Sequence, residues 1–150
     1  MRSRTRETET VGVRLPATFK ATRLARAAVR DVPALEPHHE LQFAAALLTT
    51  ERVANAVRHA GLAPDDDVAL LVECADGLFH VEVSDSGPGF FPLPYAQPRA
   101  AGRSDHGLHL VDVLADRWGF RRGEGTCCVW FDLDLVPGRR AWRGREPSRP

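Results

Sequence analysis

Residues 47–60 read LLTTERVANAVRHA, a run whose apolar side chains recur at roughly helical spacing. No Gly or Pro interrupts the chain from Leu41 to Ala60, so we predict one long helix from about His39 to Ala60. An apolar stripe that starts at Leu41 turns polar at Glu51 and Asn55, one helical turn apart. Because a buried charge is costly unless something compensates it, this stripe is either simply wet or part of a site.

A second stretch, residues 81–90, reads VEVSDSGPGF. Its apolar residues alternate as in a half-buried strand, and Asp85 takes the next core-facing position in that alternation. A carboxylate delivered to the core needs a partner, because otherwise it costs several kcal/mol or takes up a proton. The pattern Asp85-x-Gly87-x-Gly89 follows, and glycine lets backbone N–H groups come close to phosphate oxygens.

Together, Glu51-x-x-x-Asn55 and Asp85-x-Gly87-x-Gly89 resemble the N box and G1 box of the GHKL superfamily of ATP-binding proteins. That superfamily includes gyrase-type ATPases, histidine kinases and bacterial anti-sigma-factor kinases. The small, single-domain anti-sigma-factor kinases are the closest likeness, and it spans about residues 15–135. It implies an α/β (α+β) two-layer sandwich, in which a mixed, mostly antiparallel sheet is covered on one face by three helices, with Mg-ATP between the helices and a lid.

The resemblance also implies roles for polar residues of the two motifs. Glu51 would be the general base of phosphoryl transfer, and the side-chain oxygen of Asn55 would be a Mg²⁺ ligand. Asp85 would accept a hydrogen bond from the adenine amino group. Arg58 and His59 lie where a phosphate contact fits, although a solvated helix end explains each of them equally well.

Backbone-lined positions complete the implied ATP site. Gly87 and Gly89 belong to the G1-like motif, and Gly107-Leu108 resembles the G2 box at the start of a helix. Thr126 resembles the Thr that supports the adenine site through water. These positions are expected to bind the nucleotide by their resemblance to the family motifs.

One position departs from the family pattern. Residues 87–105 lack periodicity and contain four prolines, so we interpret them as the ATP lid. Asp105 stands where these small kinases commonly have a Gly two residues before Gly-Leu. A carboxylate there repels a triphosphate and puts turnover in doubt, whereas Arg99 and Arg103 either offset that charge or are simply lid surface.

These observations lead to a functional hypothesis with a rival. The resemblance implies a serine/threonine protein kinase that phosphorylates an anti-sigma-factor antagonist and sequesters a sigma factor, with a homodimer as an analogy only. The alternative is a catalytically silent nucleotide-binding module that acts by sequestering its partner. Asp105 favours this module, and the intact Glu51 favours the enzyme. A histidine-kinase fragment would need dimerisation helices, for which this sequence has no room.

Composition excludes several other classes. Twenty basic and twenty acidic residues balance, so no overall field recruits nucleic acid or an anionic membrane. No apolar run approaches the ~20 residues of a membrane span, and no signal-peptide core follows Met1, so we expect a cytoplasmic protein. His106-x-x-His109 and Cys127-Cys128 lack further ligands for a metal, and the three cysteines suit buried thiols.

The pattern along the chain predicts one domain over residues 10–136, after a disordered segment 1–9 and before a flexible Arg/Pro-rich tail 137–150. An amphipathic helix is expected from Ala17 to Arg30, with Phe19 among its apolar residues, and another from His106 to Trp118, ended by Gly119. Strands are expected at 10–15, 68–74, 78–84, near 120–121 and at 126–135, the second and third joined as a hairpin.

Overall fold

The structure is a computed structural model that describes residues 8–59, 62–63, 65–86, 106–123 and 125–136. Its elements in chain order are β1 (Glu9–Pro16), α1 (Lys20–Arg30), the short 3₁₀ helix η1 (Pro33–Leu35), α2 (His39–His59), β2 (Asp67–Ala75), β3 (Leu78–Asp85), α3 (His106–Leu114), β4 (Arg117–Gly123) and β5 (Thr126–Asp134). The expectations for residues 1–7, for the lid at 87–105 and for the tail at 137–150 lie outside the described residues.

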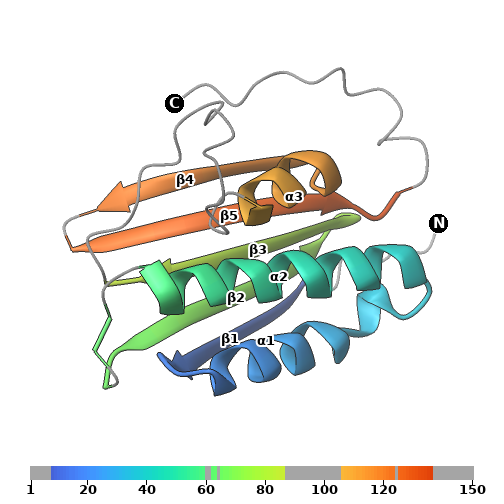
Figure 1. The fold of residues 1–150 in the computed structure, drawn as a ribbon. Coiled ribbons are helices and arrows are strands. Elements are labelled where there is room, and N and C mark those ends of the chain that lie inside the picture. Colours follow the sequence, from blue (N-terminus) through green and yellow to red (C-terminus); the bar gives the residue numbers. More distant parts are fainter. Residues whose placement is uncertain (1–7, 60–61, 64, 87–105, 124, 137–150) are drawn as a thin grey trace.

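The five strands form one sheet in the order β1-β2-β3-β5-β4. Every neighbouring pair in the described sheet is antiparallel. Helices α1, α2 and α3 lie on the same face of that sheet, with α2 between the other two (Figure 1). The predicted two-layer α+β sandwich is therefore confirmed, and the parallel pairing that a mixed sheet requires does not occur among these five strands.

The core lies between α1, α2 and the covered face of the sheet. Alternation along the central strands buries Val68, Leu70 and Val72 from β2, and Phe79 and Val81 from β3. Full burial of one such side chain stabilises the fold by about 1.5–3 kcal/mol, so these strands hold the sheet against the helices. None of the helices in the described ranges has the length and apolar character needed to cross a membrane.

The predicted hairpin between β2 and β3 is confirmed. Ala75 pairs with Leu78, and the two residues between them, Asp76 and Gly77, have φ angles of 54° and 76°. Positive φ at both central positions is the geometry of a type I′ turn, whose twist matches that of the two strands. This turn sets the register that places Asp85 at the end of β3.

Two predicted helix boundaries were wrong. Helix α1 begins at Lys20, three residues later than predicted, because Ala17 donates its N–H to the carbonyl of Asp66 at 3.0 Å and continues the turn after β1. Phe19 precedes the first helical residue and is 91% exposed. The apolar face of α1 consists instead of the small buried residues Ala21, Ala25 and Val29.

The second error concerns the end of α3, which lies at Leu114 and not at Trp118. Residues 117–123 form the edge strand β4, in which Trp118 pairs with Phe131. Gly119 does not end a helix. A Cβ on Gly119 would lie 2.8 Å from the indole of Trp130, so glycine is needed there for close packing of β4 against this ring. Tertiary packing thus overrides the helical pattern of this segment.

Candidate functional site

The polar stripe of α2 is a buried feature of the fold. The C-terminal ends of α2 and β3 and the first residues of β5 lie at the same end of the sandwich (Figure 1). Asn55 is only 6% exposed, and Glu51, one turn earlier, is half-buried. The interpretation of this stripe as a simply wet helix face is therefore wrong for Asn55, which needs a compensating partner.

Three buried side chains of α2 have polar atoms without a hydrogen-bond partner among the described residues. They are Thr49 through Oγ1, Arg52 through Nε and both terminal guanidinium nitrogens, and Asn55 through Nδ2. Thr49 and Arg52 are 0% and 2% exposed. A buried polar group without a partner costs about 1–3 kcal/mol, and more when it is charged. Such a cluster is the kind of feature that a bound ligand explains.

Sequence reasoning missed Arg52, although the signal for it was present. Arg52 follows Leu48 by four residues and precedes Asn55 by three, so the apolar stripe of α2 passes directly through it. Burial lowers the pKa of Arg52 to about 10, while the Glu51 carboxylate acts in the opposite direction. At neutral pH the side chain is still a cation, so α2 carries a buried positive charge.

Asp85 ends β3 where the alternation predicted it. It is half-buried and pairs in register with Val68 on one side and Cys127 on the other. Burial raises the pKa of the Cys127 thiol, and the Asp85 carboxylate raises it further. Because its pKa is raised, the Cys127 thiol adds no negative charge beside the Asp85 carboxylate.

The other predicted site residues have more varied positions. Thr126 is the exposed first residue of β5, next to the Cys127 that pairs with Asp85. Arg58 is exposed in the last turn of α2, and Gly107 and Leu108 lie in the first turn of α3. Gly87 and Gly89, and the side chain of His59, lie outside the described part of the structure. The described residues thus place Asp85 and Thr126 on the neighbouring strands β3 and β5, and Glu51 and Asn55 one turn apart on α2.

The unpartnered polar groups of α2 suit a nucleotide better than a metal ion by itself. The unpartnered atoms of Arg52 and Asn55 are N–H donors, which suit phosphate oxygens. The amide oxygen of Asn55 is the kind of single protein ligand that Mg²⁺ accepts together with phosphates and water. Within the described ranges, no three His, Cys, Asp or Glu side chains form a group that could hold a metal by themselves.

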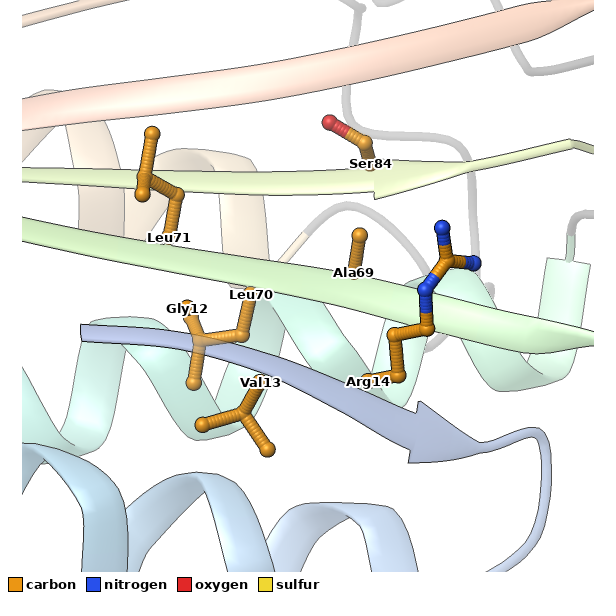
Figure 2. A pocket seen from close by; sticks show the side chains of 7 residues that line it. All are labelled: Gly12, Val13, Arg14, Ala69, Leu70, Leu71 and Ser84. Atoms are coloured by element: carbon orange, nitrogen blue, oxygen red, sulfur yellow. The ribbon is translucent and has the colours of Figure 1, made fainter.

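A hollow of about 330 Å³ lies elsewhere, across β1, β2 and β3 (Figure 2). Gly12, Arg14, Ala69 and Ser84 are among its lining residues, mostly on the face of the sheet opposite the helices. It arises because short side chains leave space between neighbouring strands. It contains none of the predicted site residues, so we do not assign the nucleotide to it.

The described residues form an α+β sandwich in which α2 carries buried polar groups without a hydrogen-bond partner among those residues. A family model described as the histidine kinase-like ATPase domain matches residues 15–132. The chain therefore belongs to the histidine kinase-like ATPase family, which confirms the resemblance seen in its motifs.

A solved structure supports the fold independently. The crystal structure of the RsbU and RsbW domains of Rv1364c from Mycobacterium tuberculosis is similar, with a TM-score of 0.64 and 23% sequence identity. The match covers 85% of this chain and 32% of that longer chain. At this identity the likeness shows the fold alone. No curated protein matches this chain in sequence.

Proposed function

We propose that this chain binds ATP with Mg²⁺ and is an anti-sigma-factor-type serine/threonine protein kinase. Its substrate would be an anti-sigma-factor antagonist, and it would sequester a sigma factor through its surface. The observation that carries the proposal is the buried amide of Asn55, without a partner for Nδ2 among the described residues and one turn from Glu51. Family membership and the RsbW domain in the similar structure support it.

The proposed mechanism assigns each residue one task. Asp85 accepts a hydrogen bond from the adenine amino group and orients the base. The Asn55 amide oxygen would hold Mg²⁺, which when bound would neutralise charge on the phosphates. A Glu51 carboxylate oxygen would accept the proton of the attacking Ser or Thr hydroxyl. The hydroxyl oxygen would bond to the γ-phosphorus of ATP while the bond from that phosphorus to the bridging oxygen breaks and ADP leaves. Glu51 is half-buried, so its carboxylate keeps some of the solvent access that a protein substrate requires.

The remaining predicted residues would hold the nucleotide in place. Arg58 and His59, at the C-terminal end of α2, would contact phosphate. Gly87, Gly89, Gly107 and Leu108 would present backbone N–H groups to it, as glycine-rich turns and helix N-termini do. Thr126 would support the adenine site beside Asp85, a position consistent with its place next to Cys127 in β5.

Phosphate transfer tests this proposal. The chain is incubated with radiolabelled ATP, Mg²⁺ and a candidate antagonist protein, and the label on Ser or Thr is measured. The proposal predicts labelling that Glu51→Ala slows by orders of magnitude while ATP binding persists. Labelling at the wild-type rate in Glu51→Ala would show that Glu51 is not the base.

A second candidate function is a regulatory module that binds ATP and a partner without turnover. Asp105 favours it, because a carboxylate at that position of the sequence opposes closure on the terminal phosphate. The same assay separates the two functions. The module would bind ATP and the partner protein but leave the partner unlabelled, and Asp105→Gly would then be the variant to test for gained transfer.

A further inference from the structure

Arg52 is a buried charged residue of α2 to which the family motifs give no role. It lies on the covered face of α2, between the fully buried Leu48 and the buried Asn55, and is itself 2% exposed. All three of its guanidinium nitrogens lack a hydrogen-bond partner among the described residues. An unpaired charge in such a place costs several kcal/mol, so a protein that keeps one needs an anionic partner.

The neighbouring groups define what that partner must offer. Thr49 and Asn55, one turn before and one turn after Arg52, also have unpartnered buried atoms, Oγ1 and Nδ2. Each of these three side chains can donate hydrogen bonds, and Arg52 adds a full positive charge. A ligand complementary to this set is rich in acceptors and negatively charged. Phosphate groups meet both requirements, and the planar guanidinium matches their oxygens bidentately.

We propose that Arg52 binds the polyphosphate of the nucleotide and that its positive charge offsets the negative charge of the phosphates. The inference rests on the nucleotide binding of the proposed function and deepens it by naming a phosphate-contacting residue. Position on α2 favours phosphate over the base. Arg52 is one turn from Asn55, a residue assigned to phosphoryl transfer, whereas the base is assigned to Asp85 on β3.

The charges around Arg52 also favour phosphate as its partner. The carboxylate that acts on the pKa of Arg52, against the larger effect of burial, is that of Glu51. Since Glu51 is half-buried and is assigned to the reacting hydroxyl, it does not replace a bidentate anion on the guanidinium. The uncharged adenine ring offers only isolated acceptors and would leave the charge of Arg52 uncompensated.

The test compares Arg52→Met with the wild-type protein in two measurements. Met fills similar space without charge, so the unliganded variant should unfold several degrees higher than the wild type, because an unpaired buried cation is gone. ATP affinity should fall about 10- to 100-fold, the range expected when a charge-assisted hydrogen bond is lost. The affinity for adenosine should not change. The loss of affinity for ADP should lie between that for adenosine and that for ATP.

Arg26→Met is the matched control. Arg26 is an exposed residue of α1, so this variant makes the same change in net charge away from the site. It should change neither stability nor ATP affinity by a measurable amount. Arg52→Lys keeps the charge but loses the planar fork, and should recover part of the ATP affinity. If Arg52→Met does not fold, the Lys variant with the adenosine-to-ATP series carries the test.

The outcomes separate this inference from the proposed kinase. Equal ATP affinities for the wild type and Arg52→Met, or an equal loss for ATP and adenosine, would overturn the role of Arg52 and leave the kinase standing. ATP binding that depends on Arg52, without phosphate transfer, would support Arg52 and overturn the kinase. A wild-type protein that binds no nucleotide would overturn both.

Discussion

The two faces of the sheet treat polar side chains in opposite ways. On the open face, His80, Glu82, Asp132, Arg117 and Arg121 are joined by hydrogen bonds and ion pairs. On the covered face, Thr49, Arg52 and Asn55 are more deeply buried, yet each has polar atoms without a partner among the described residues. Internally satisfied groups hold the structure together, whereas the unsatisfied groups of α2 are the ones that the proposed nucleotide would satisfy.

The open-face network is centred on His80 and Asp132. The Asp132 carboxylate accepts hydrogen bonds from His80 Nδ1 at 2.6 Å and from Arg117 Nε at 3.0 Å. The other ring nitrogen, His80 Nε2, lies 3.0 Å from Glu82 Oε1. Burial by itself would lower the pKa of His80, but the hydrogen bonds to the two carboxylates outweigh it and raise the pKa. The network therefore favours a doubly protonated imidazole.

Removal of the proposed base should give the largest effect. Glu51→Ala should lower the rate of phosphate transfer to the antagonist about 10²- to 10⁴-fold, the usual contribution of general-base catalysis. ATP affinity should change little, because Glu51 is assigned to the incoming hydroxyl. Single-turnover transfer and a separate ATP titration measure the two quantities, and Glu82→Ala, on the open face, is the control that should keep the transfer rate.

A matched pair of carboxylate-to-amide changes compares the two faces directly. Asp85→Asn should weaken ATP binding about 10- to 100-fold, because the amide cannot accept the adenine hydrogen bond with a full charge. Calorimetric titration measures this affinity. Unchanged ATP affinity in Asp85→Asn would remove Asp85 from the site.

Asp132→Asn is the other half of this pair. Asp132 is buried and accepts from both His80 and Arg117, so the amide leaves two donors poorly satisfied. We expect a loss of about 1–3 kcal/mol in the free energy of unfolding with ATP affinity unchanged. Denaturant unfolding gives the first quantity. A variant with normal stability but weakened ATP binding would reverse the roles of the two faces.

The smallest effect expected is a dependence of stability on pH. The pKa of His80 is raised in the folded protein, so its pairing stabilises the fold fully below the ordinary value of about 6.5 and is lost as pH rises through the folded value. The wild type should therefore lose slightly more stability than His80→Gln between about pH 6 and pH 8. Parallel pH dependences in the two proteins would show that the network does not hold a proton on His80.

The faces also differ in how far the sequence could predict them. Alternation and the Asp76-Gly77 turn predicted β2, β3 and the position of Asp85, because local pattern fixes a hairpin and its register. The open-face network was not predictable in this way. His80, Asp132 and Arg117 come together only because β5 lies between β3 and β4, and strand order is a property of the whole chain.

Two local signals were misread for physical reasons. A charged side chain in an amphipathic helix is normally on its wet face, so Arg52 went unnoticed even though its spacing from Leu48 places it on the buried face. Trp118 and Gly119 read as the end of a helix, but in the sheet Trp118 pairs with Phe131, and Gly119 makes room for the indole of Trp130, so this segment is a strand. The site motifs were visible because their spacing is local, whereas the spacing of Arg52 from Leu48 became a decisive signal only once the side chain was seen to be buried.

Calorimetric titration of the wild-type chain with ATP, in the presence and absence of Mg²⁺ and beside Asn55→Ala, tests the central claim most directly. The claim is that the unsatisfied polar groups of α2 form a nucleotide site. It predicts binding by the wild type that Mg²⁺ strengthens, and an Asn55→Ala variant that binds ATP more weakly and no longer responds to Mg²⁺. Equal binding by both proteins, or no binding by the wild type, would contradict it.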